Sequence, residues 1–307
     1  PTLAMLVERA GQISNFQKEK YFNVELDCDG IPAVKPKIFD LDEAEQLRSR
    51  CQGSEAIVTA VKETEKKVKA PKLYDLTTLQ REANRIYGMT AKQTLDTAQS
   101  LYEKKLITYP RTDSQYLTED MEQTARNVVR QIYEKYQLTG PFDQPEQPDV
   151  KKVMNNSKVT DHHAIIPTME LASSHLDELK SWEEKILFLI AVHTVMAMSK
   201  DHIYQETEIE VECQGEIFKA KGRTVLQDGW KLFENCFKNK DRMAIVDPDQ
   251  EMKERMPKVA QGQTFYAVAA EKTEHFTSPP KPYSEDTLLA AMETAGNKEF
   301  DEDTEKK

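Results

Sequence analysis

The spacing of hydrophobic positions changes several times along the chain, and each change predicts a different kind of element. Apolar residues over 3–14 recur at helical intervals, which predicts an amphipathic helix. Apolar and polar residues alternate over 22–28, as in a half-buried strand. A short helix over 41–51 and a second strand over 56–61 follow. The highly charged segment 62–71 ends on a proline and is interpreted as a hinge.

Helical spacing dominates the middle of the chain. Thr77 and Gln80 have the capping-box spacing, in which two side chains satisfy each other's backbone amides at a helix start. Thr90 repeats this spacing with Gln93, so a helix is expected to begin at each pair. The segment 186–192 is apolar on most sides and predicts a helix at the centre of the core. The expected helices have apolar stripes over 79–86, 91–101, 121–136 and 186–192.

Strand-like alternation returns over 207–213, continues from Ile217 and recurs over 265–270. A last helix, capped by Ser284, is expected to end at Gly296. Because strands flank the helical block on both sides, the sequence predicts an α+β fold with a β-rich domain interrupted by an α-rich one. The expected boundaries are 18–71 and 200–277 for the β-rich domain, 72–199 for the α-rich domain, and 1–17 and 278–307 for two pieces of a further domain.

Charge and cysteine content restrict the classes of partner. The 307-residue chain has a formal net charge of −11, which argues against a surface that coats polyanions in general. Between Lys72 and Gln115, however, seven basic side chains outnumber five acidic ones, so any nucleic-acid contact is expected to be local. The four cysteines form no Cys-x-x-Cys pair, which argues against a zinc site and a disulfide framework. They are Cys28, Cys51, Cys213 and Cys236.

No apolar run approaches the roughly 20 residues that span a bilayer. The protein is therefore predicted to be cytoplasmic, with no membrane partner.

The segment 106–114 combines a candidate nucleophile with a candidate phosphate clamp. Pro110 cannot continue a helix and moves Tyr109 toward an extended backbone, which places Tyr109, Arg111 and Asp113 on one face. A phenol titrates near pH 10 and needs a positive neighbour to act as a nucleophile at neutral pH. A guanidinium can also bind two phosphate oxygens at once. The spacing alone is equally compatible with a packing role, because the chain has 11 tyrosines.

Three motifs together resemble those of one enzyme family. The active-site segment of type IA DNA topoisomerases resembles 107–114 (ITYPRTDS), and the proline after the tyrosine is most similar to the bacterial topoisomerase III branch. The family's entry into its tyrosine-bearing domain resembles 74–80 (YDLTTLQ), and its histidine motif resembles 161–168 (DHHAIIPT). The similarity extends from Pro1 to about Gly296.

The resemblance implies a fold and a reaction. The β-rich domain would be a hinge, the α-rich domain would carry the tyrosine, and with a gate domain they would form part of a toroidal arch around a hole wide enough for duplex DNA. Tyr109 is expected to attack a single-strand phosphodiester, leaving a 5′-phosphotyrosyl link and a free 3′-hydroxyl. Resealing after strand passage then needs no ATP. Arg111 is expected to hold the phosphate, and His162 to contact the DNA backbone near the cleaved bond.

Four further residues are expected to bind DNA. For Gln80 and Arg85 a solvated helix face is an equal alternative, and Asp113 could instead cap a turn or accept a hydrogen bond from Arg111. His163 stands where the family often has an acidic residue, and the scattered histidines are expected on the surface or satisfied in the core. The expected DNA-binding residues are Gln80, Arg85, Thr108 and Asp113.

No metal-ligand cluster is apparent, and the acidic, magnesium-binding nucleotidyl-transfer domain of the family is absent from the sequence. The chain is therefore expected to be a piece of a longer, Mg²⁺-dependent protein, and by itself to neither relax nor efficiently cleave DNA. The expected partner is a single-stranded segment of DNA, with a helicase as a further candidate. A monomer associated with the nucleoid is expected.

Two alternatives remain open at this stage. The chain could be a non-catalytic arch module that binds single-stranded DNA and keeps the tyrosine motif as a structural relic. It could also be a tyrosine strand-transferase of the integrase type, which joins to the 3′-phosphate. The DNA end that becomes attached to the tyrosine distinguishes the integrase type from a type IA topoisomerase. The Tyr109→Phe substitution distinguishes an enzyme from a binding module.

Overall fold

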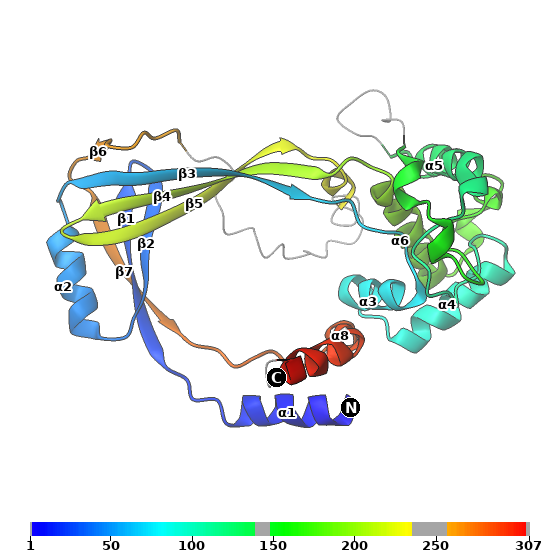
Figure 1. Cartoon of the computed structure of the whole chain (residues 1–307), viewed down its shortest axis with the longest axis horizontal. Coiled ribbons are helices and arrows are strands. Elements are labelled where there is room, and N and C mark those ends of the chain that lie inside the picture. The colour runs from blue at the N-terminus through cyan, green and yellow to red at the C-terminus, as the bar shows by residue number, and fades with distance from the viewer. Residues whose placement is uncertain (1, 139–147, 235–256, 305–307) are drawn as a thin grey trace.

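The chain forms a curled antiparallel sheet and a helical body, which long strands connect (Figure 1). This computed structural model describes the backbone of residues 2–138, 148–234 and 257–304, and the side chains of these residues up to Ala295. The α-helices are α1 (Thr2–Ser14), α2 (Leu41–Cys51), α3 (Leu76–Tyr87), α4 (Ala91–Glu103), α5 (Glu122–Tyr136), α6 (Ser181–Ala197) and α8 (Glu285–Thr304). Short 3-10 helices lie at Glu119–Met121, Val150–Val153, Asn156–Lys158, Met169–Leu171 and Leu176–Glu178.

The sheet has seven strands within the described residues, in the order β6-β3-β4-β5-β2-β1-β7. Every second residue of β1, from Phe22 to Cys28, is buried, as the alternating pattern predicts. These side chains share a core with the buried face of α2, which covers one side of the sheet (Figure 1). The strands are β1 (Lys20–Cys28), β2 (Ile31–Ile38), β3 (Ala56–Val68), β4 (His202–Cys213), β5 (Glu216–Gln227), β6 (Thr264–Phe265) and β7 (Ala269–Phe276).

A second core lies in the helical body, between α3, α4, α5 and α6. All residues of α6 from Ile186 to Ala197 are buried, which confirms the prediction of a central helix. The predicted cap at Thr90 is also confirmed, because Thr90 and Gln93 form a capping box at the start of α4. Gly88 ends α3 in the left-handed conformation, with φ 67°.

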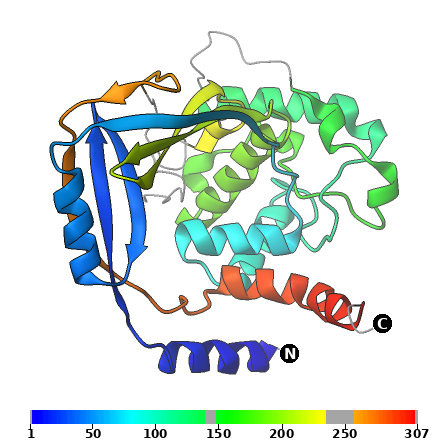
Figure 2. The same cartoon turned by 60° about the vertical axis from the view of Figure 1, so that its left-hand side comes forward.

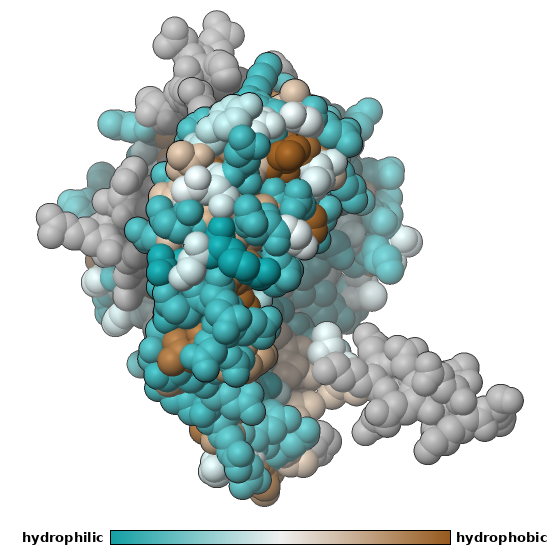
Figure 3. All heavy atoms as spheres, turned by 90° about the vertical axis from the view of Figure 1, so that its left-hand side faces the viewer, coloured by the Kyte–Doolittle hydropathy of each residue, from teal (hydrophilic) through white to brown (hydrophobic). Residues whose placement is uncertain are grey.

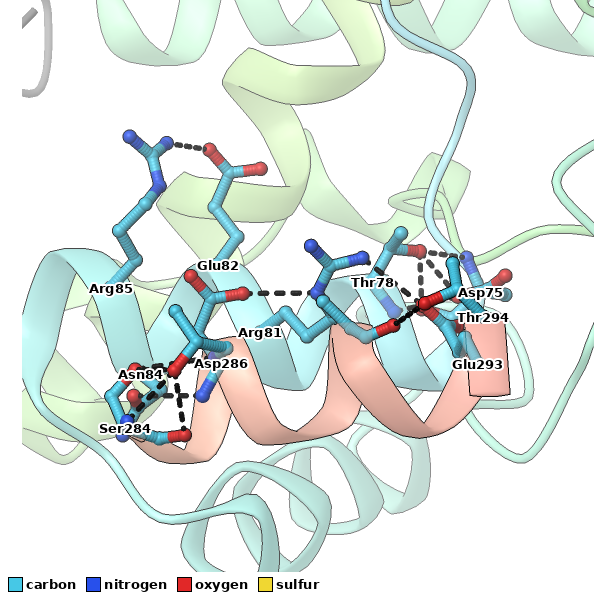
Figure 4. A network of polar contacts seen from close by, with 12 residues as sticks. Asp75, Thr78, Arg81, Glu82, Asn84, Arg85, Ser284, Asp286, Glu293 and Thr294 are labelled. Carbon is cyan, nitrogen blue, oxygen red and sulfur yellow. Dashed lines mark hydrogen bonds and ion pairs between the residues drawn. The ribbon is translucent and has the colours of Figure 1, made fainter. Parts of the chain in front are cut away.

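The elements follow an arch. The long strands β3, β4 and β5 run from the α2-covered sheet to the helical body, and both views place α8 beside α3, with α1 beyond α8 (Figures 1 and 2). Arg81 of α3 connects the two helices by ion pairs with Asp286 at 2.9 Å and Glu293 at 3.1 Å (Figure 4). The face at the α2 end is mostly hydrophilic, with small scattered apolar patches (Figure 3). No described helix is long and apolar enough to cross a membrane.

The prediction that 62–71 is a hinge is wrong for most of the segment. Residues 62–68 continue β3 and pair with residues 202–208 of β4. Their charged side chains meet partners on that strand: Lys66 Nζ lies 3.9 Å from Glu206 Oε1. The alternating charges, which suggest a solvated linker in the sequence, take part in cross-strand pairing instead.

Other boundaries also differ from the predictions. The cap of α3 is Asp75, which accepts a hydrogen bond from the Thr78 amide at 2.7 Å, and Thr77 does not cap it. Ala267 has a φ of +52°, which divides the predicted strand 265–270 into β6 and β7. The last helix does not end at Gly296 but continues to Thr304.

Strand β2 was not predicted, because Pro32 and Pro36 interrupt its pattern. A proline cannot donate to a strand ladder. Of the cysteines, Cys28, Cys51 and Cys213 are buried and free, and Cys236 lies outside the described residues.

Candidate active site

The segment that carries Tyr109 begins at a reversal of the chain after α4. Lys105 adopts a left-handed backbone, with φ 61°, and the Leu106 amide donates to the carbonyl of Leu101 at 2.9 Å. The chain then runs beside the histidine motif. The Thr108 amide donates to the Ile166 carbonyl and the Thr168 amide to the Leu106 carbonyl, both at 3.0 Å.

Two threonine side chains strengthen this pairing. The Thr108 hydroxyl donates to the carbonyl of Ala164 at 3.0 Å and accepts a hydrogen bond from the amide of Ile166 at 3.0 Å. The buried Thr112 hydroxyl donates to the carbonyl of His162 at 2.9 Å. The Thr108 hydroxyl therefore links two backbone segments of the protein. Its predicted contact with DNA stays a prediction.

The third motif joins the same assembly. The Leu76 amide donates to the Thr112 carbonyl at 3.0 Å, and the Ile165 amide donates to the Tyr74 carbonyl at 2.8 Å. Gln115 also donates to the Asp75 carboxylate at 2.9 Å. The three motifs lie far apart in the sequence but meet at one place in the fold.

Tyr109 lies at this meeting point, and its ring contacts two others. Its centroid is 4.4 Å from that of the exposed His162 and 5.3 Å from that of Tyr102, whose ring is nearly perpendicular to it at 77°. Tyr109 itself is half-buried, so its ring is supported while the side chain remains accessible.

Arg111 and Asp113 are both exposed on the same segment. Neither side chain forms a hydrogen bond or an ion pair with any residue in the part of the chain that the structure describes. The predicted hydrogen bond between them is therefore not seen. An unpaired guanidinium two residues from a phenol is available to bind an anionic group.

Gln80 and Arg85 are engaged elsewhere. The Gln80 amide donates to the carbonyl of Ala91 at 2.9 Å and so links α3 to the start of α4. Arg85 is paired with Glu82 of the same helix. Among the described contacts, neither is hydrogen-bonded to the segment 106–114.

A buried polar cluster supports the assembly from behind, and sequence analysis did not predict it. His193 of α6 stacks on Tyr74 with centroids 3.7 Å apart and bonds through Nε2 to the Lys72 carbonyl at 2.8 Å, so it is a satisfied core histidine, as the scattered histidines were expected to be. The Tyr74 hydroxyl donates to Glu82 at 2.8 Å. Because these residues are far apart in the sequence, no spacing rule connects them.

Burial affects the pKa of all three titratable side chains in this cluster, Tyr74, His193 and Glu82. It raises the pKa of Tyr74 well above its usual value and lowers the pKa of His193, so both are neutral near pH 7. Burial opposes ionisation of Glu82, but the charge of Arg85, that of His193 when it is protonated, and the hydrogen bonds from Tyr74 and Arg85 hold its pKa below the ordinary value.

The described side chains offer no obvious metal centre. No group of three or more His, Cys, Asp or Glu residues within the described ranges is arranged to hold a metal ion. Asp113 is the only carboxylate on the segment 106–114.

Comparison with known proteins agrees with the geometry. The family model described as DNA topoisomerase matches residues 1–296, and the chain belongs to this family. It is 37% identical over 308 residues to DNA topoisomerase 3 of Bacillus licheniformis and 36% identical over 305 residues to that of Bacillus subtilis, in each case over 95% of this chain and 41% of the relative. The chain thus spans about two fifths of the length of these curated relatives.

A solved structure has the same fold. Full-length topoisomerase I from Thermotoga maritima superimposes with a TM-score of 0.70 and 26% sequence identity, over 95% of this chain and 46% of that one. The expected α+β fold, as part of an arch, is thereby confirmed, and the structure adds that its sheet is curled.

Proposed function

We propose that this chain carries the nucleophile of a type IA DNA topoisomerase and that Tyr109 attacks a phosphodiester of single-stranded DNA. The observation that carries the proposal is the juxtaposition of Tyr109 and His162, whose ring centroids are 4.4 Å apart, on a segment whose Arg111 is exposed and has no partner among the described residues. A scaffold of backbone and threonine hydrogen bonds fixes the two segments, so the geometry exists before any substrate binds.

The proposed step exchanges one phosphoester for another. The Tyr109 oxygen forms a bond to phosphorus, the bond from phosphorus to the 3′-oxygen breaks, the phenol loses its proton, and the leaving 3′-oxygen gains one. Arg111 holds the phosphate oxygens, and its charge favours the phenolate and the more negative transition state. His162 donates a hydrogen bond to the DNA backbone. The reverse reaction restores the strand without ATP.

Strand passage between cleavage and resealing would change the linking of DNA. The arch in Figure 1 and the DNA topoisomerase 3 relatives support this part of the proposal. We propose a single-stranded segment of DNA as the substrate, the nucleoid as the location, a monomer as the functional state and a helicase as a candidate partner.

We propose that the whole protein requires Mg²⁺ and that residues outside this chain bind the ion. The proposal is supported by the scattered carboxylates of the site: within the described residues no three possible metal ligands come together, and Asp113 is the only carboxylate on its segment. We therefore assign no step to a metal. The 307-residue chain by itself is expected to bind single strands without cleaving them efficiently, and magnesium-dependent relaxation by it would contradict this expectation.

The test uses the natural protein that contains these 307 residues, as wild type and as Tyr109→Phe. Each is mixed with magnesium and an oligonucleotide labelled at its 3′ end or, in a parallel sample, at its 5′ end, and then quenched with detergent. We expect the 3′ label to remain with wild-type protein only. Transfer of the 5′ label would instead indicate the integrase type of chemistry.

Absence of both labels from the wild-type protein, with binding of the oligonucleotide retained, would overturn the proposal and favour a non-catalytic binding module.

A further inference from the structure

Tyr102 lies at the end of α4, beside the proposed nucleophile. The chain reversal at Lys105 returns the backbone along the helix end, and the Lys105 amide donates to the Tyr102 carbonyl at 2.8 Å. This turn brings Tyr109 next to Tyr102, with ring centroids 5.3 Å apart. Neither the helical stripe nor the tyrosine motif indicates this contact in the sequence.

The core does not need the Tyr102 ring. The buried side of α4 consists of Thr94, Ala98 and Leu101, whereas Tyr102 is 39% exposed. Its hydroxyl has no hydrogen-bond partner among the residues that the structure describes. A large aromatic side chain is thus presented to solvent while its ring also contacts that of the proposed nucleophile.

An exposed aromatic face suits a nucleobase. Bases of single-stranded nucleic acid stack on aromatic side chains irrespective of their sequence, because every base has a π-face. Neighbouring nucleotides rise by about 3.4 Å along a stacked strand, so a strand whose phosphate reaches Tyr109 brings an adjacent base to Tyr102. Arg111, which is exposed on the segment of Tyr109 and has no partner among the described residues, favours the same anionic occupant.

We propose that Tyr102 is a stacking platform for the base next to the scissile phosphate and thereby helps to choose where the strand is cut. This inference rests on the proposed function, since it takes Tyr109 as the attacking residue. In this role Tyr102 contacts the DNA directly. If it only held the Tyr109 ring, removal of a base from the DNA would weaken binding equally with and without the Tyr102 ring.

Binding can be measured without cleavage in a Tyr109→Phe background, which keeps the ring beside Tyr102. Oligonucleotides with a single abasic site, moved one position at a time, are titrated against the natural protein that contains this chain. Removal of the stacked base should weaken binding about tenfold. In Tyr109→Phe with Tyr102→Leu the same abasic site should have no further effect, whereas Tyr102→Phe should restore the wild-type response.

Tyr266→Leu is the matched control, because Tyr266 is 72% exposed and lies between β6 and β7, away from the site. It should leave the abasic profile unchanged. In the protein with Tyr109 intact, the sensitive position should be adjacent to the mapped cut, and Tyr102→Leu should redistribute the cuts. The stacking role would be overturned if the effect of Tyr102→Leu on binding were the same at every abasic position. It would also be overturned if Tyr102→Leu weakened cleavage without such a dependence on an abasic position. The binding measurements detect base stacking even if no covalent adduct forms. A negative result in them is therefore distinguishable from a failure of the proposed function.

Discussion

The hydroxyl of Thr112 donates a hydrogen bond to the carbonyl of His162 at 2.9 Å. This contact joins the segment of the proposed nucleophile to the histidine motif at the residue that lies beside the Tyr109 ring. The same oxygen accepts a hydrogen bond from the Ser114 amide at 3.1 Å. Thr112 thus fixes the distance between the tyrosine segment and the histidine motif.

Replacement of Thr112 by valine should separate these segments without a large change in volume. The carbonyl of His162 and the buried amide of Ser114 lose their partner, which is expected to lower the free energy of unfolding by about 2 kcal/mol and to reduce covalent trapping of DNA. Urea denaturation and the labelled-oligonucleotide assay measure the two effects. Thr118→Val is the control, because the Thr118 side chain makes no capping hydrogen bond. Equal effects of both substitutions would contradict a specific role for Thr112.

Glu183 should make stability depend on acid. It accepts hydrogen bonds from Ser100 at 2.7 Å and from Lys104 at 2.6 Å, and its own helix cap contributes a third at 2.9 Å. Burial opposes its ionisation, but these donors outweigh it and lower the pKa to about 2. Because the folded pKa lies below the unfolded one, the stabilisation is present above about pH 4.5 and is lost as the pH falls toward 2.

Glu183→Gln should therefore destabilise the protein at pH 7, by at most about 3 kcal/mol, and much less near pH 3. Urea midpoints at the two pH values test this expectation. Glu184→Gln alters the neighbouring, exposed carboxylate and should have little effect at either pH. A Glu183→Gln effect that is independent of pH would show that lost packing or helix capping, not charge, is responsible.

His193 should affect stability at a higher pH. Burial lowers its pKa in the folded state, so the unfolded chain binds the proton more readily below about pH 6.5. Its contribution to stability is complete above that pH and declines as the pH falls toward the folded pKa. Unfolding measured between pH 5 and 8 should lose this component in His193→Gln, and retention of the full wild-type slope would exclude His193 as its source. The exposed His175, changed to Gln, serves as the control.

Arg81 should govern the attachment of α8 to α3. Its two ion pairs are partly exposed and connect elements distant in the sequence (Figure 4). Arg81→Gln should increase hydrogen exchange of the α8 amides by roughly threefold to tenfold at low salt, and added salt should reduce the difference because it screens the wild-type pairs. Lys92→Gln removes an ion pair within α4 and should not alter α8. Unchanged exchange in Arg81→Gln would show that other contacts hold the helix.

Several elements followed from the sequence because their determinants are local. The Thr90 cap and the alternation from Phe22 to Cys28 each depend on residues within one turn or one strand. The charged residues 62–68 were wrongly predicted to be a hinge, because their structure depends on residues distant in the sequence. Whether such a segment is a linker or a strand depends on the partner strand, which lies more than a hundred residues away.

The candidate site divides in the same way. The sequence by itself determined the nucleophile motif, the histidine motif and the Thr90 cap of α4, because residue type and short-range spacing encode these features. Only the tertiary structure decided that the Tyr109 ring contacts those of His162 and Tyr102, that Arg111 has no partner among the described residues, and that Gln80 and Arg85 contact protein groups. Those relationships arise from backbone hydrogen bonds and packing between segments that meet only after long loops have closed, and no local pattern specifies which segments will meet.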